Sequence, residues 1–194
     1  MAERWTQEKM REVAAEERGW LGVGLMDPLD PYALAREHGI PVYPIDELPD
    51  EYCSRDAVAH FTVRRPKVWS AALVPVGSVR IILENTGHAQ VRRRSSVAHE
   101  LSHHFLEHEF VGVLLTDDGC RRFDKKMEKD ATFLAGELLI PYQAALKAAF
   151  AEKTNEEIAA SYEVSTQFAQ MCMKGARVHA QRALAKQSRS RHAR

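Results

Sequence analysis

The segment His99-Glu100-Leu101-Ser102-His103 decides how the rest of the chain is interpreted. If this segment is helical, His99 and His103 lie one turn apart on the same face, so that both imidazoles can reach one metal ion. Glu100 lies beside the pair, where its carboxylate can take a proton from water at the metal. The pattern therefore predicts a catalytic metal site near the middle of the chain.

The composition is that of an ordinary globular chain, and 194 residues suffice for one compact domain, or for one with a small appendage. Twenty-seven basic residues balance twenty-seven acidic ones, so the net charge gives no general attraction to nucleic acid or membranes. The three cysteines are widely spaced, which predicts free thiols in a reducing compartment. No apolar run approaches the ~18 residues of a membrane span, and the N-terminus is too polar for a signal peptide. We therefore expect a cytoplasmic protein that does not enter membranes.

Three short runs in the first half of the chain are rich in branched and aromatic residues, as β-strands are. They occupy residues 58–63, 68–74 and 79–83 and are separated by turn signals with proline or glycine. This pattern predicts a small three-stranded antiparallel sheet. The preceding residues 40–45 contain two prolines, so we expect that segment at a sheet edge or outside the ladder.

Apolar residues at helical spacing predict most of the remaining elements. The metal motif lies on a helix expected at about residues 91–107, and a second apolar stripe predicts a helix over 123–140. Asp30, Pro31 and Gly39 are typical of the N-cap, the first position and the end of a short helix. The helices and the sheet together indicate an α+β fold.

A catalytic zinc site usually has three protein ligands, so the histidine pair requires a third. His104 and His108 follow the motif, but on a straight helix they point about 140° and 180° away from His99. The third ligand should therefore come from the next helix, where Asp124 and Glu128 lie on one flank of the apolar stripe. The residues alone leave the choice between Asp124 and Glu128 open.

The motif and the later segment from Glu128 to Pro141 together resemble a known family. The later segment has the pattern E-x-x-A-x-x-x-A-x-x-L-L-x-P and, after a helical HExxH, is similar to the ImmA/IrrE family of bacterial metallo-endopeptidases. The first glutamate of that pattern is the third ligand in the family. One departure is Ser102, where the family often has glycine. The resemblance implies a Zn²⁺ ion held by His99, His103 and Glu128, with Glu100 as the catalytic base.

The resemblance also implies the architecture and the substrate. We expect a zincin-like metallopeptidase domain over residues 1–141, a helical, helix-turn-helix-like extension over 142–186 and a flexible tail over 187–194. The implied substrate is a protein, namely a DNA-binding transcriptional repressor whose cleavage releases stress, phage or mobile-element genes. The residues themselves specify neither the repressor nor the oligomeric state.

Other interpretations remain open beside the peptidase. The two motif histidines could be ordinary core histidines, or the zinc could be purely structural, although closed structural sites usually include cysteine. The helices after Glu156 could also make the protein a zinc-binding regulator that acts on DNA or a partner without proteolysis. The second of these helices, around residues 167–173, is too apolar for good groove contacts, so we do not expect direct nucleic-acid binding.

Two details of the expected mechanism concern residues outside the motif. An extended peptide could add to an edge of the sheet, and we expect Val79–Leu83 or its neighbouring strand to receive it. The residue that stabilises the oxyanion is not assigned by the sequence. The candidates are His60, His104 and Tyr142.

Overall fold

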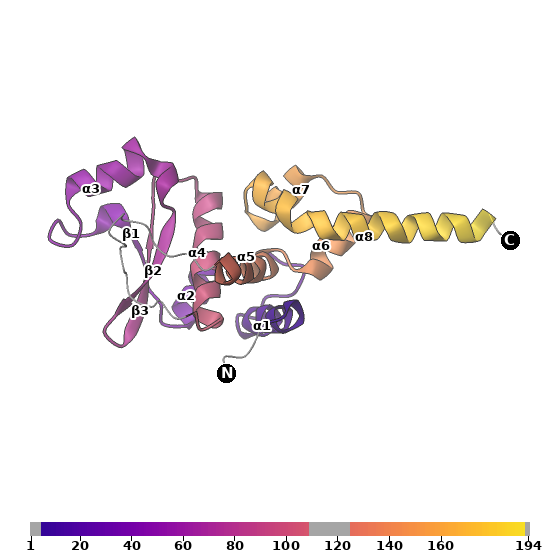
Figure 1. Cartoon of the computed structure of the whole chain (residues 1–194), viewed down its shortest axis with the longest axis horizontal. Coiled ribbons are helices and arrows are strands. Elements are labelled where there is room, and N and C mark those ends of the chain that lie inside the picture. The colour runs from indigo at the N-terminus through magenta and orange to yellow at the C-terminus, as the bar shows by residue number, and fades with distance from the viewer. Residues whose placement is uncertain (1–4, 109–124, 193–194) are drawn as a thin grey trace.

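The computed structural model describes residues 5–108 and 125–192, and within the last helix it describes side chains as far as residue 189. The described chain is rich in helices and contains one small sheet, which confirms the α+β class (Figure 1). In chain order the elements are α1 (Gln7–Trp20), α2 (Pro31–Glu37), β1 (Val42–Pro44), the 3₁₀ turn η1 (Ile45–Glu47), α3 (Arg55–Ala59), the π-helical turn η2 (His60–Arg64), the 3₁₀ turn η3 (Pro66–Val68), β2 (Ala71–Val76), β3 (Val79–Glu84), α4 (Gln90–Phe105), α5 (Lys125–Leu139), α6 (Tyr142–Phe150), α7 (Asn155–Tyr162) and α8 (Thr166–His192).

The sheet has three strands, as expected, but it is mixed rather than antiparallel. Its order is β1-β3-β2, with β2 antiparallel to β3 so that Leu73 lies opposite Ile82. The strand β1 runs parallel to β3, with Tyr43 opposite Leu83. The expected first strand, residues 58–63, is instead helical and belongs to α3 and η2. The proline-containing segment supplies the third strand and lies at an edge of the sheet, as its prolines predict.

Local capping and one buried side chain explain why residues 58–63 are helical. The Ser54 hydroxyl accepts a hydrogen bond from the Ala57 N–H at 3.2 Å and so caps α3. The amide of the fully buried Asn85 donates to the carbonyl oxygens of Phe61 and Trp69, each at 2.8 Å. These bonds satisfy backbone groups that a strand would have paired within the sheet, and Asn85 is too distant in sequence for a local pattern to show them.

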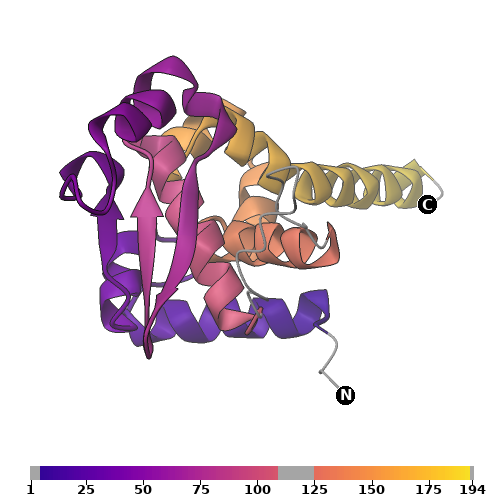
Figure 2. The same ribbon diagram turned by 60° about the vertical axis from the view of Figure 1, so that its left-hand side comes forward.

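The motif helix α4 lies between the sheet and α5 (Figure 2). Its apolar row packs as predicted, because Val97 and Leu101 are fully buried and Phe105 is partly buried. On the facing side of α5, Ala131 and Ala135 are also buried, and their small side chains let the two helices approach closely. The close approach places the first turn of α5 beside the motif.

The helices after residue 141 share the hydrophobic core of the preceding residues. The Tyr162 hydroxyl donates to the Met26 carbonyl oxygen at 3.2 Å, and Ala169 and Met173 at the start of α8 are fully buried. One face of these helices is therefore buried against the rest of the chain. The division into two domains at residue 141 stays a prediction, and the core runs across it.

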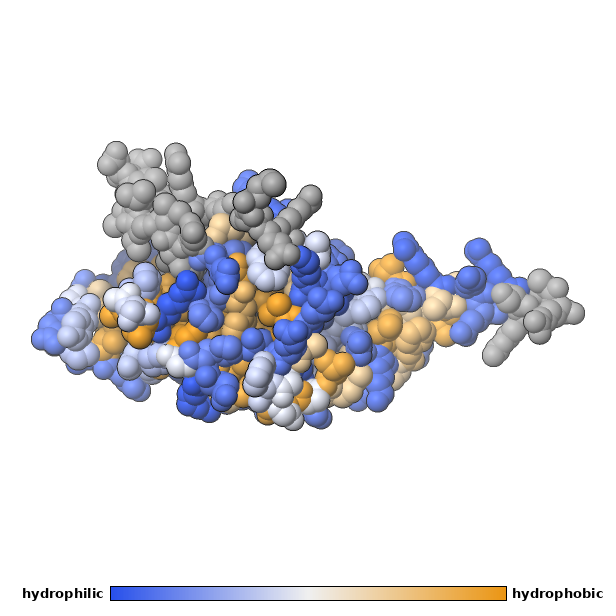
Figure 3. All heavy atoms as spheres, turned by 90° about the horizontal axis from the view of Figure 1, so that it is seen from below, coloured by the Kyte–Doolittle hydropathy of each residue, from blue (hydrophilic) through white to orange (hydrophobic). Residues whose placement is uncertain are grey.

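Beyond Ala180 the helix α8 extends away from the body of the molecule (Figure 1). From Gln181 to Arg189 every side chain is exposed except that of Ala183, which is half-buried. Hydrophilic and apolar residues lie side by side on this projecting part in the face that Figure 3 shows. The helix continues to residue 192 through the segment that we expected to be a flexible tail, and the flexibility of that tail stays a prediction.

Candidate metal centre

Three side chains from α4 and α5 converge on one point, and among the described residues they form the one group of three that could hold a metal ion. His99 Nε2 lies 3.1 Å from His103 Nε2 and 3.2 Å from Glu128 Oε2, and His103 Nε2 lies 3.6 Å from Glu128 Oε1. Tetrahedral zinc with bonds of about 2.0–2.1 Å separates its ligand atoms by about 3.3–3.4 Å. The spacing and the chemistry of these donors therefore fit Zn²⁺.

The helices position these ligands through local features of the sequence. The i, i+4 spacing aligns the two histidines along α4, and the close α4–α5 packing carries Glu128 to them. Ser102, where the resembled family often has glycine, is fully buried and donates to the Ala98 carbonyl oxygen of its own helix at 2.7 Å. Serine therefore fits at this position without disturbing the site. The other ligand candidate, Asp124, lies outside the described residues.

The electrostatics of the group keep the Glu128 carboxylate ionised. Its contact with His99 holds the pKa of Glu128 below the ordinary value, and the charge of the His103 ring acts in the same direction. Burial raises the pKa of this half-buried carboxyl but is the smaller effect. An anionic carboxylate beside two imidazoles is a suitable donor set for a divalent cation.

Glu100 faces the same cleft as the histidines but is not part of the donor group. Its Oε2 accepts a hydrogen bond from the Leu73 backbone N–H in β2 at 2.8 Å, and only 9% of the residue is exposed. This bond fixes the carboxylate between the motif helix and the edge of the sheet. The residue is thus oriented by a second element, as a catalytic base should be.

His108 is a functional neighbour that the sequence analysis missed. The chain leaves α4 after Phe105, takes a left-handed turn at Glu107 (φ 51°) and brings His108 Nδ1 to 2.9 Å from His103 Nδ1. A metal ion held at His103 Nε2 would leave its Nδ1–H to donate to His108, which would fix the orientation of the ring. The sequence analysis placed His108 on the far side of the helix because it assumed that a straight helix continues through this residue. Recognising from the sequence that the helix ends before His108 would have shown this contact to be possible.

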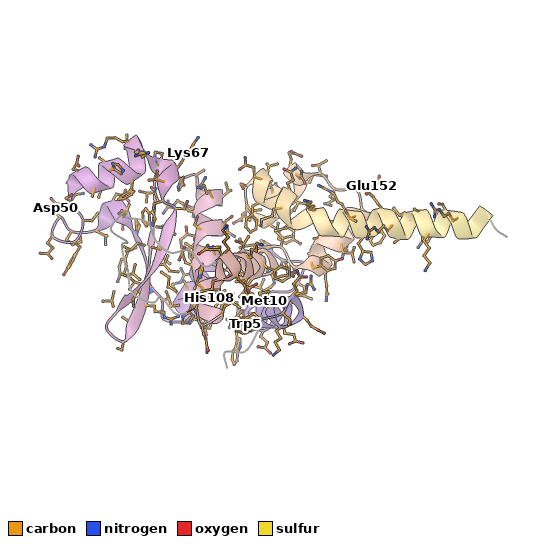
Figure 4. The ribbon with its side chains drawn as sticks, viewed as in Figure 1. Trp5, Met10, Asp50, Lys67, His108 and Glu152 are labelled. Carbon is orange, nitrogen blue, oxygen red and sulfur yellow. The ribbon has the colours of Figure 1, made fainter. Side chains whose placement is uncertain are left out.

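The end of α4 is also tied to the N-terminal region. The Trp5 indole N–H donates to the Leu106 carbonyl oxygen at 3.0 Å, and Figure 4 shows Trp5 near His108 at this end of α4. The hydrogen bond satisfies one of the carbonyl groups that the helix end leaves without a partner within the helix. It therefore helps to fix the turn that carries His108.

The candidate centre lies in a cleft of about 1060 Å³ between β2, α4 and α8. Trp69 and Ala71 line the sheet side of the cleft, and Phe168 and Met171 line the side of α8. A second cavity of about 530 Å³ follows α5 and shares Glu128 and Met171 with the first. Glu128 therefore borders both cavities, and the two histidines border the larger one.

The three candidates for the oxyanion group are not among the residues that line the cleft. The ring of His60 packs against Phe61, and His104 contacts Arg80 through its Nδ1 at 2.9 Å. Tyr142 lines the second cavity and its hydroxyl lies 2.9 Å from His179 Nδ1. The described residues thus give no support to any of the three.

Neither of the two described cysteines is part of the donor group. Cys53 and Cys172 are free thiols, and Cys120 lies outside the described residues. Burial, with a contribution from Glu137, raises the pKa of the Cys172 thiol to about 12. A protonated thiol is a poor metal ligand, which leaves the histidine and glutamate donors as the candidate centre.

A helical histidine pair completed by a carboxylate from the next helix is typical of metallopeptidases. The chain belongs to the peptidase M78 family, because the model of its IrrE N-terminal-like domain matches residues 35–174. This match confirms the resemblance to the ImmA/IrrE family and supports a metallopeptidase-type function in general. Comparisons with curated proteins and with solved structures found no match. No helix in the described part of the chain has the length and apolar character needed to cross a membrane.

Proposed function

We propose that the protein is a zinc-dependent endopeptidase. The observation that carries the proposal is the spacing of the donor atoms of His99, His103 and Glu128, with the Glu100 carboxylate held in the same cleft. Membership of the peptidase M78 family supports the same conclusion independently of the geometry. His99, His103 and Glu128 would hold the ion, and Glu100 would act as the base.

When bound, Zn²⁺ supplies Lewis acidity that activates water and polarises the scissile carbonyl. Glu100 accepts the proton of the attacking water and returns it to the nitrogen of the leaving amine. The Leu73 N–H keeps the carboxylate aimed into the cleft during both transfers. His108 fixes the His103 ring and with it one corner of the donor group.

We further propose that the substrate binds as an extended strand along β2. Of the two strands expected to receive a peptide, β3 is the central strand of the sheet and β2, its neighbour, is an edge strand. The Ser70 carbonyl oxygen accepts the Asn85 N–H at 3.0 Å, so the alternation of the ladder turns the backbone groups of Ala71 and Leu73 away from β3. The Leu73 N–H is bonded to Glu100, and the backbone groups of Ala71 and the carbonyl oxygen of Leu73 can pair with a peptide on the same side.

The proposed substrate is a DNA-binding transcriptional repressor in the cytoplasm, and its cleavage would release the repressed genes. Support for this step comes from the family resemblance and not from particular residues of the cleft. Incubation of the zinc-loaded protein with a helix-turn-helix repressor encoded nearby should give one discrete cut. Intact repressor after prolonged incubation would argue against this choice of substrate.

The Glu100→Gln variant tests the mechanism directly. Glutamine keeps the size of the side chain but cannot accept the proton, so we expect full zinc content and a loss of cleavage of at least about 100-fold. The matched control is Glu16→Gln, which makes the same substitution at an exposed residue of α1 outside the cleft and should keep both zinc and activity. Cleavage at the wild-type rate by Glu100→Gln would contradict the proposed mechanism.

A further inference from the structure

The three consecutive arginines that precede the motif have different surroundings. Arg93 forms an ion pair with the buried Glu84, and Arg94 is 7% exposed and donates to the Leu29 carbonyl oxygen at 2.7 Å. Both therefore connect α4 to neighbouring segments. Arg92, by contrast, is exposed and forms part of the wall of the metal cleft.

Arg92 is the one Lys or Arg among the described residues that line this cleft, where the other charged residues are Glu100 and Glu128. Its Nη2 donates to the Ser70 hydroxyl at 2.9 Å. In the described part of the chain, no carboxylate forms an ion pair with it. A guanidinium that is oriented by a neutral partner keeps donors for a carboxylate from outside.

The hydroxyl that orients Arg92 is itself held in place. Ser70 Oγ lies 3.4 Å from His88 Nε2, which also lies 3.2 Å from the Trp69 carbonyl oxygen. Burial lowers the pKa of His88, the hydrogen bond with the Trp69 carbonyl oxygen raises it and the charge of Arg92 lowers it, and the net shift is downward, which favours the neutral ring. The positive charge at this end of the cleft therefore comes from Arg92.

The distance between Arg92 and the candidate metal centre can be estimated along α4 and, independently, along β2, and the two estimates agree. Along α4, His99 follows Arg92 by seven residues, which is about 10 Å at 1.5 Å per residue. Along the sheet, Ser70 precedes Leu73, whose N–H holds Glu100, by three residues, which is again about 10 Å at 3.3 Å per residue. An extended peptide on β2 covers this distance with about three residues.

We propose that Arg92 is a specificity-determining residue that binds the carboxylate of an aspartate or glutamate of the substrate. The acidic side chain would lie about three residues from the scissile bond. The proposal rests on the proposed peptidase function and on the binding of substrate along β2. It adds a chemical requirement on the substrate that the metal centre alone does not impose.

Binding of a peptide library to an inactive protein tests this proposal. The probe is a synthetic library of end-blocked dodecapeptides with randomised positions, passed over immobilised, zinc-loaded Glu100→Gln protein, and the retained peptides are sequenced. The same library is passed over variants that add Arg92→Glu, Arg92→Gln or Lys67→Glu. Lys67 is a matched control, because it is exposed and is not among the residues that line the cleft.

We expect the Glu100→Gln protein to enrich peptides with Asp or Glu by about two- to fivefold, as for an ion pair at an exposed site. Arg92→Gln should abolish this preference, Arg92→Glu should replace it by one for Lys and Arg, and Lys67→Glu should leave it unchanged. Absence of acidic enrichment, or the same enrichment with Arg92→Glu, would overturn the proposal. Zinc content and circular dichroism of each variant show that the fold is kept.

Cleavage of the retained peptides by wild-type protein separates this inference from the proposed function. If the function is right, the cut should fall about three residues from the enriched acid. If the acidic preference depends on Arg92 but no retained peptide is cut, the proposed function fails while the binding role of Arg92 stands. A cut at random distances from the acid would contradict the placement of the substrate along β2.

Discussion

The helices α4 and α8 are supported in different ways along their lengths. Neighbouring elements pack around α4, and its Val97 and Leu101 are fully buried, whereas α8 beyond Ala180 projects from the body of the molecule. Packing fixes the side chains of α4 relative to α5 and β2, and the outer part of α8 depends chiefly on its own backbone hydrogen bonds. The candidate centre lies on the packed helix, where donor atoms can be held within fractions of an ångström.

The largest effect should follow from removing one buried side chain from α4. Leu101→Ala leaves a cavity between α4 and its neighbours, so the free energy of unfolding should fall by about 2–5 kcal/mol. Leu184→Ala makes the same change on the projecting part of α8, where 46% of the residue is exposed, and should cost less than about 1 kcal/mol. Urea unfolding of both metal-free variants measures the difference. Equal losses would contradict the contrast between the two helices.

A smaller effect is expected from the residue that orients His103. His108→Ala removes the partner of His103 Nδ1, so zinc affinity should fall about 10- to 100-fold while the fold is kept. His104→Ala is the matched control, because His104 contacts Arg80 and lies outside the cleft. Competition with a chromophoric chelator measures both affinities. Wild-type affinity in His108→Ala would show that the contact has no role in metal binding.

The smallest effect should come from shortening α8. A chain that ends at Arg182 keeps the buried Ala176 and Ala180, and the described side chains that it loses are exposed apart from the half-buried Ala183. Its free energy of unfolding should change by less than about 0.5 kcal/mol, and its zinc content should not change. Thermal unfolding and metal analysis of the truncated chain check this. A cooperative loss of stability would mean that the projecting part supports the core.

The sequence correctly predicted those elements that are determined by neighbouring residues, such as helix caps and apolar residues at helical spacing. The short helix α2 begins at Asp30, whose side chain accepts the Tyr32 N–H at 3.0 Å, and Gly39 (φ 63°) follows its end as expected. The apolar stripes of α4 and α5 were likewise recognised from periodicity. The structure brings Glu128 to the motif histidines, although the choice over Asp124 required the family resemblance.

The elements that were missed depend on contacts between distant residues. Residues 58–63 have branched side chains typical of a strand, but the Asn85 amide holds their helical conformation from outside the segment. The parallel pairing of β1 with β3 likewise joins segments about forty residues apart. The contact of His108 with His103 was missed because the left-handed turn at Glu107, which redirects the chain, has no glycine to mark it.

Zinc binding by the Glu128→Ala variant tests the central claim most directly. The account predicts about one zinc ion per chain in the wild-type protein and loss of stoichiometric binding in Glu128→Ala, because two histidines alone do not complete the site. Asp130→Ala, which removes a carboxylate on another face of α5, should bind zinc as the wild type does. Stoichiometric zinc with wild-type affinity in Glu128→Ala would contradict the account.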